Sequence, residues 1–167
     1  RDGQWIVYSS ADPERGGIWK IRTDGSEDIQ VASGAFILPE VSPDGRYVLY
    51  KTTDVENTRH VLRVSDLESH ESVFETHIEF NSLQTQIEPG RSRWSRDGNV
   101  IFFIGINDQG KHALFAQNFM PGADTSASRR VILELDGTAD VESFGISPDG
   151  TRVTVSSSEQ SFSLKIA

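Results

Sequence analysis

The stretch Ser42-Pro43-Asp44-Gly45, followed by the strand-like run Arg46-Tyr47-Val48-Leu49-Tyr50, decides the fold of this chain. Proline fixes φ at the start of a tight turn, aspartate accepts hydrogen bonds from nearby backbone N–H groups, and glycine supplies a positive φ. Such a turn joins two antiparallel strands. An Asp-Gly pair ahead of a β-rich run occurs three further times, at Arg1-Asp2-Gly3, Ser95-Arg96-Asp97-Gly98 and Ser147-Pro148-Asp149-Gly150.

The four glycines are 42, 53 and 52 residues apart, which is typical of β-propeller blades. Each turn lies within a pattern of four short strands, and no helical periodicity is sustained, so the chain is predicted to be all-β. Besides the strand after each turn, we expect first strands at 36–41, 91–94 and 141–146, third strands at 17–21, 60–64, 113–116 and 162–166, and fourth strands at 28–32, 72–80 and 130–134.

The predicted architecture is a β-propeller of four-stranded antiparallel blades, with about three and a half blades present. The blades are expected at 1–34 (partial), 35–80, 81–136 and 137–167 (partial). Such an arc leaves open blade edges, which would allow self-association. Three alternatives remain: a larger propeller contains these blades, copies of the chain complete the ring, or further strands of this chain complete a four-bladed ring.

The Ser-Pro-Asp-Gly turns, with Ile18-Trp19-Lys20-Ile21-Arg22-Thr23-Asp24-Gly25-Ser26 as a third strand and turn, resemble the WD40-like (PD40) repeat of TolB-like β-propellers. The resemblance implies a non-catalytic module that binds a protein or peptide, located in the periplasm or otherwise outside the cytoplasm, within a larger bacterial protein. An alternative is the gating propeller of a prolyl-oligopeptidase-type serine peptidase whose catalytic domain lies outside this chain.

Composition excludes several classes of function. The net charge of −9 argues against sequence-independent nucleic-acid binding, and the absence of cysteine excludes disulfides and thiolate metal sites. No apolar run is long enough to span a bilayer, so membrane insertion is not expected. No Gly-x-Ser-x-Gly nucleophile elbow and no phosphate-binding glycine loop occur, so we expect neither an enzyme nor a cofactor.

Two groups of residues are candidates for binding. Arg91 and Arg93 alternate on an expected first strand, which would line the propeller channel and present both guanidinium groups to an anion or an acidic peptide terminus. Glu75, His77 and Glu79 share one face of an expected fourth strand, where they could bind a divalent cation or form an ordinary solvated surface.

The aspartates of the repeated turns admit two interpretations, as ligands on one face of the ring or as turn formers. We favour the structural role, because one repeat rule places them all. The residues assigned to it are Asp44, Gly45, Asp97, Gly98, Asp149 and Gly150.

Overall fold

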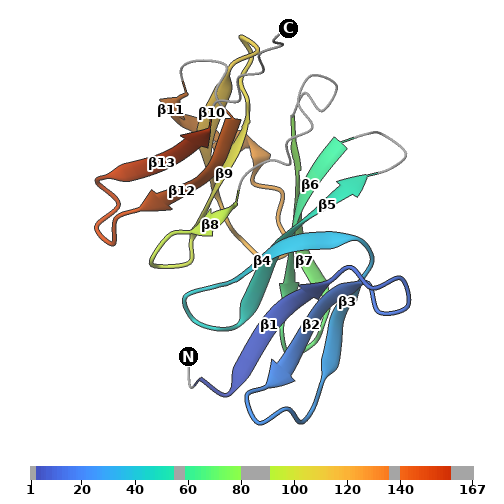
Figure 1. The fold of residues 1–167 in the computed structure, drawn as a ribbon. Helices are drawn as coiled ribbons and strands as arrows, with labels where there is room; N and C mark the ends of the chain where they lie inside the picture. The colour runs from blue at the N-terminus through green and yellow to red at the C-terminus, as the bar shows by residue number, and fades with distance from the viewer. Residues whose placement is uncertain (1–2, 55–58, 80–90, 136–139, 159–167) are drawn as a thin grey trace, which may run out of the picture.

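The computed structural model describes residues 3–54, 59–79, 91–135 and 140–158, and within these ranges it confirms an all-β propeller arc (Figure 1). Four antiparallel sheets follow one another in chain order, and the ring that they form is not closed. The described ranges contain a single 3-10 turn, η1 (Ser126–Ser128), and no helix long and apolar enough to cross a membrane.

Two of the sheets have four strands. The second sheet has the order β4 (Phe36–Val41), β5 (Tyr47–Asp54), β6 (Arg59–Asp66) and β7 (Ser72–Ile78). The third sheet has β8 (Arg93–Trp94), β9 (Val100–Ile106), β10 (His112–Asn118) and β11 (Arg130–Glu134). In both, the strand before the Asp-Gly turn lies at one edge of the sheet, and we call it the inner strand.

The outer two sheets of the arc are smaller. The first has β1 (Trp5–Ser10), β2 (Gly17–Arg22) and β3 (Ile29–Ser33), without an inner strand among the described residues. The fourth has β12 (Asp140–Ile146) and β13 (Val153–Ser158). The third strand expected at 162–166 lies outside the described residues, and the inner strand expected at 91–94 is shorter, at Arg93–Trp94.

The three repeated turns that the structure describes in full, at Ser42, Ser95 and Ser147, have the same hydrogen bonds. Gly45 adopts φ 80° and donates its N–H to the Ser42 carbonyl at 2.9 Å, and the Ser42 hydroxyl accepts the N–H of Tyr47 at 2.9 Å. Ser95 and Ser147 accept the equivalent N–H groups, each at 2.9 Å. Glycine is needed at the fourth turn position because a positive φ costs other residues about 1–2 kcal/mol.

Side chains of the strand after each turn alternate between two neighbouring sheets. Val48 and Tyr50 pack against the first sheet, whereas Leu49 packs against the third. In the third sheet, Ile101 packs back against the second sheet and Phe102 packs forward against the fourth. Both faces of these strands are therefore buried, as expected for stacked blades.

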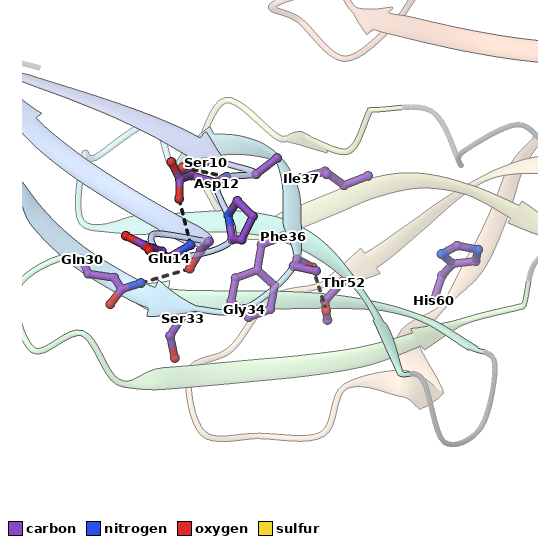
Figure 2. Close-up of a pocket in the computed structure, with 14 residues that line it drawn as sticks. Ser10, Asp12, Glu14, Gln30, Ser33, Gly34, Phe36, Ile37, Thr52 and His60 are labelled. Atoms are coloured by element: carbon purple, nitrogen blue, oxygen red, sulfur yellow. Dashed lines mark hydrogen bonds between the residues drawn. The ribbon is translucent and has the colours of Figure 1, made fainter.

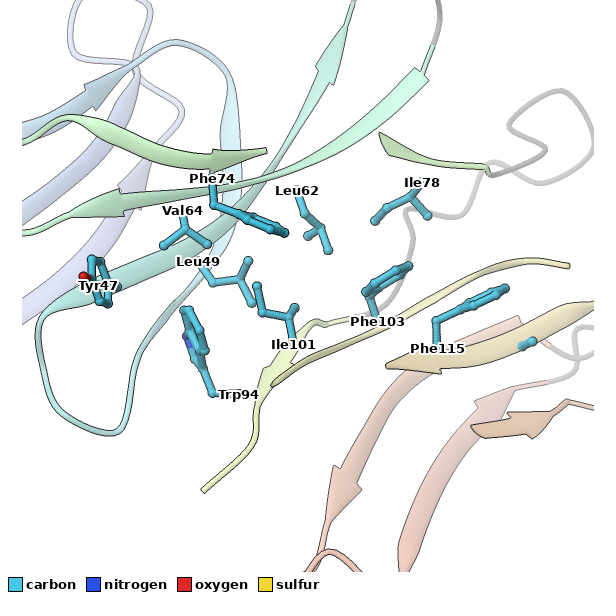
Figure 3. Close-up of a cluster of buried hydrophobic side chains, with 11 residues drawn as sticks. Tyr47, Leu49, Leu62, Val64, Phe74, Ile78, Trp94, Ile101, Phe103 and Phe115 are labelled. Atoms are coloured by element: carbon cyan, nitrogen blue, oxygen red, sulfur yellow. The ribbon is translucent and has the colours of Figure 1, made fainter. Parts of the chain in front are cut away.

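We call the interfaces between successive sheets the first, second and third seams. The second seam holds the largest cluster of buried apolar side chains, with Tyr47, Leu49 and Phe74 on one side and Trp94 and Phe103 on the other (Figure 3). Its size makes this seam the main source of hydrophobic stabilisation in the arc.

Candidate functional site

The inner strands of the second and third sheets are joined by a carboxylate that sequence reasoning missed. Glu40 of β4 forms an ion pair with Arg93 of β8, with 2.7 Å between Oε2 and Nη1. The other carboxylate oxygen accepts the Trp94 N–H at 3.1 Å, and the Glu40 carbonyl accepts the indole N–H of Trp94 at 3.0 Å. Glu40 thus holds three donors of β8 at the inner edge of the second seam.

A β-bulge in β4 brings Glu40 to this position. The pairing of β4 with β5 shifts between Ile37 and Glu40, and Leu38 adopts φ 55° inside the shift. Pro39 follows, and because proline has no N–H it is confined to bulges and edge strands in sheets. A proline in the middle of an expected strand was the signal that could have located this bulge.

The two predicted channel arginines differ in their surroundings. Arg93 is bonded to Glu40, so its positive charge is compensated within the protein. Arg91 is exposed and has no ion pair within the described ranges. Between them, the buried hydroxyl of Ser92 finds no hydrogen-bond partner. Of the two, only Arg93 has its charge compensated by a carboxylate among the described residues.

The turn aspartates are bonded within their own turns. The Asp149 carboxylate accepts the hydroxyl of Ser147 at 2.5 Å, and the N–H and hydroxyl of Thr151 at 3.1 Å and 2.8 Å. The bond from the Ser147 hydroxyl, followed by those from Thr151, lowers the pKa of Asp149 from 3.8 to about 2. The hydroxyls of Ser42 and Ser95 lower the pKa values of Asp44 and Asp97 in the same way.

These lowered pKa values predict an acid-sensitive component of stability. A carboxyl group with a depressed pKa in the folded state stabilises it above the unfolded pKa of 3.8, and this contribution is lost as the pH falls toward about 2. We expect the melting temperature of the wild type to fall more steeply between about pH 5 and pH 2 than that of Asp149→Asn. If the melting temperatures of the two proteins fell equally steeply with pH across this range, the stabilising role of the Asp149 carboxylate would be contradicted.

The three residues predicted as a metal site lie on the solvent side of the second sheet. In β7, Phe74, Thr76 and Ile78 are buried, whereas Glu75 and His77 are exposed, as is Glu79 just beyond the strand. Glu75 is bonded to Arg63 of the neighbouring strand at 2.7 Å. Throughout the described part of the chain, no three His, Asp or Glu side chains are placed to share a metal ion. The metal hypothesis gains no geometric support here.

Arg129 is a second residue that the sequence did not single out. It follows η1 and donates to Gln117 Oε1 at 3.0 Å, to Thr76 Oγ1 at 2.7 Å and to the His77 carbonyl at 2.8 Å. Burial lowers the pKa of this guanidinium, which also lies 5.2 Å from the centre of the Phe103 ring. Arg129, just before β11 of the third sheet, therefore links that sheet to β7 of the second sheet across the second seam.

A cavity of about 640 Å³ opens at the first seam, at the end of the sheets opposite the Asp-Gly turns (Figure 2). We call it the loop-face cavity. Its walls come from the β1–β2 loop and the β3–β4 connection, and the Gly34 N–H of the connection donates to the Gly16 carbonyl of the loop at 3.2 Å. The side chain of Gln30 in β3 donates to the same carbonyl at 3.1 Å. Asp12 and Glu14 line the cavity, and among the described residues no lysine or arginine does.

The described residues of this chain show no catalytic site. The four histidines of the sequence include His60, beside the loop-face cavity, and His77, on the exposed face of β7. The polar side chains that lie close together are those of the Asp-Gly turns and those around Glu40. They are bonded to one another and hold the fold together. The arrangement is that of a scaffold with surface cavities.

No family model and no curated protein matches this sequence. Solved structures with a similar fold include TolB from Acinetobacter baumannii (TM-score 0.57, 20% identity, covering 87% of this chain and 33% of that one). An oligogalacturonate lyase in complex with manganese has TM-score 0.64 and 14% identity, covering 91% of this chain and 41% of that one. A prolyl endopeptidase has TM-score 0.67 and 13% identity, covering 97% of this chain and 24% of that one.

The chain spans less than half the length of each of these three neighbours, and at these identities the similarity concerns the fold. The repeat pattern in the sequence, the strand order of the sheets and the similar solved structures all indicate a β-propeller. The chain has the fold of a TolB-like β-propeller, and its four sheets form an arc of the ring.

Proposed function

We propose that this chain is part of a non-catalytic β-propeller module that binds a protein or peptide. The observation that carries the proposal is the loop-face cavity, whose volume of about 640 Å³ lies within the range of ligand-binding pockets. It is built from loops that connect strands of a β-sheet scaffold, which is how rigid folds commonly present binding residues.

The cavity can be tested with peptides selected on the protein. Phage-displayed peptides of random sequence would be selected on the immobilised wild type and then measured against Ser33→Trp, which places a large ring at the rim of the cavity. We expect the selected peptides to lose binding to this variant and to retain it for Gln109→Trp, in an exposed turn of the third sheet. Equal binding to both variants would remove the cavity from the proposal.

Arg91 offers a second contact, to an acidic segment of the same partner. Arg91 is exposed and lies two residues before the inner strand β8. We expect hexaglutamate to bind the wild type several-fold more tightly than Arg91→Ala at low salt, because exposed charge pairs are worth up to about 1 kcal/mol. Arg96→Ala, in the adjacent turn, is the control, and an equal loss in both variants would refute a specific role for Arg91.

The resemblance to TolB supports a place in the periplasm, within a larger bacterial protein. The similarity to a prolyl endopeptidase supports the alternative of a gating propeller in a peptidase whose nucleophile lies elsewhere. A full-length sequence with a Gly-x-Ser-x-Gly elbow after this segment would favour that alternative.

A further inference from the structure

The repeat allows residues of the first and second seams to be compared position by position. In the first three sheets, the carbonyl of the residue after the turn glycine accepts an N–H from the residue that follows the third strand. Leu67 donates to Arg46 at 2.8 Å, and Phe119 donates to Asn99 at 2.8 Å. Leu67 and Phe119 therefore occupy equivalent positions.

In the second seam, Phe119 completes an aromatic cluster. Its ring centre lies 4.9 Å from that of Trp94, 5.2 Å from that of Tyr47 and 5.5 Å from that of Phe74, and all three pairs are edge-to-face. Edge-to-face contacts at these distances are favourable beyond the area they bury. The four rings fill the end of the second seam that carries the Asp-Gly turns.

The first seam has smaller side chains at the same positions. Val41 precedes the turn serine as Trp94 does, Leu67 corresponds to Phe119, and Ile29 pairs with β2 where Phe74 pairs with β6. Trp5, two residues after the turn glycine like Tyr47, is the one aromatic ring that remains. Three rings of the second seam are thus replaced by aliphatic side chains.

The replacement coincides with a cavity. A volume of about 590 Å³ opens at the turn end of the first seam, and Trp5, Lys20, Val41 and Leu67 line it. We call it the turn-face cavity. Val41 is 39% exposed there, whereas Trp94 at the equivalent position of the second seam is 8% exposed. An apolar volume that the next seam fills with rings is left open to solvent.

Three of the charged groups around the turn-face cavity, those of Asp44, Arg46 and Lys20, are bonded within the protein, whereas the exposed Glu68 has no side-chain partner among the described residues. Arg46 is paired with Asp66 at 2.9 Å, and Asp44 accepts the Ser42 hydroxyl at 2.5 Å. The Lys20 ammonium donates to the Leu67 carbonyl and lies 5.2 Å from the centre of the Trp5 ring. A neutral occupant therefore fits better than an anionic one, because Arg46 and Lys20 already have partners and the Glu68 carboxylate would repel an anion.

We propose that the turn-face cavity binds an aromatic side chain of a partner protein or peptide, in the volume that the rings of Trp94 and Phe119 fill in the second seam and that the smaller Val41 and Leu67 leave open in the first. The inference rests on the proposed binding function and names the side chain that this seam recognises. The Trp5 ring supplies an edge-to-face partner, and Val41 and Leu67 supply an apolar wall.

The test uses small probes and the indole N–H signals of the three tryptophans in NMR spectra. N-acetyl-phenylalanine amide should shift the Trp5 signal saturably, and N-acetyl-leucine amide should bind about threefold to tenfold more weakly. N-acetyl-glycine amide should have no effect. The Trp19 and Trp94 signals serve as internal controls, because their N–H groups are bonded to the carbonyls of Arg15 and Glu40 at 2.8 Å and 3.0 Å.

Variants test the site in both directions, by filling the cavity of the first seam and by opening one in the second. Val41→Trp combined with Leu67→Phe rebuilds the side chains of the second seam, and should raise the melting temperature and weaken the phenylalanine probe about tenfold or more. Ile132→Trp, on the exposed strand β11, is the control for an added ring and should bind like the wild type. Phe119→Leu should open the second seam, so that the Trp94 signal now responds to the probe. Should the double variant not fold, Val41→Phe alone provides the same comparison.

An unmoved Trp5 signal, or equal binding by wild type and filled variant, would overturn the inference. The phage-displayed peptides selected on the wild type separate this failure from failure of the proposed function. If the selected peptides lose binding to Ser33→Trp, only the turn-face site is wrong. If the selection yields no binding peptide, or only peptides that bind Ser33→Trp and wild type equally, the proposed function fails as well.

Discussion

Trp94→Ala should lower the free energy of unfolding by about 3–5 kcal/mol, the largest effect that we expect from a single substitution. The indole is 8% exposed, lies 4.9 Å from the Phe119 ring and donates its N–H to the Glu40 carbonyl. Its removal leaves a cavity in the largest cluster of the arc and an inner-strand carbonyl without this donor. Urea denaturation followed by circular dichroism measures the loss.

Met120→Ala is the matched control for Trp94→Ala. Met120 is 59% exposed and directly follows Phe119 in the chain, so its truncation should change the free energy of unfolding by no more than about 0.5 kcal/mol. If Trp94→Ala were as mild as this control, the second seam would not be the main source of stability in the arc.

Glu40→Ala should cost about 1–3 kcal/mol, because it leaves Arg93 and the Trp94 N–H without their carboxylate. Glu40 and Arg93 are 25% and 30% exposed, so water compensates part of the loss. A double-mutant cycle with Arg93→Ala isolates the pair, and we expect a coupling energy above about 1 kcal/mol.

The ion pair between Arg63 and Glu75 is the comparison for this cycle. It has the same distance of 2.7 Å but lies on the exposed face of the second sheet, with side chains 37% and 42% exposed. Its coupling energy should be at most about 1 kcal/mol, as for exposed ion pairs in general. Equal coupling energies in both cycles would show that Glu40 does not join the inner strands as we infer.

Most of the fold could be predicted because its signals are local. Ser42, Asp44 and Gly45 specify their turn through hydrogen bonds between residues no more than five apart, and the same bonds recur at Ser95 and Ser147. The alternating pattern of β7 likewise predicted which side chains would be buried. Local chemistry of this kind is readable from one sequence.

The bonded partners at the candidate site were not predictable in the same way. Glu40 and Arg93 are 53 residues apart, and Arg129 is 53 residues from Thr76, so no local pattern links either pair. The bulge at Leu38 decides which side chain of β4 reaches β8, and its position depends on the pairing with β5. Arg93 was predicted to face a ligand, but the tertiary structure gave it a carboxylate partner.

The sequence by itself determined the repeated turns, the four sheets and the alternation of buried side chains, because these depend on hydrogen bonds and periodicity within a few residues. Only the tertiary structure decided how well each seam is filled. The second seam packs Trp94 and Phe119 against its neighbours, whereas Val41 and Leu67 leave the first seam open, and this difference appears only when residues from different sheets meet. Packing between sheets is a property of matched volumes, which no single strand carries.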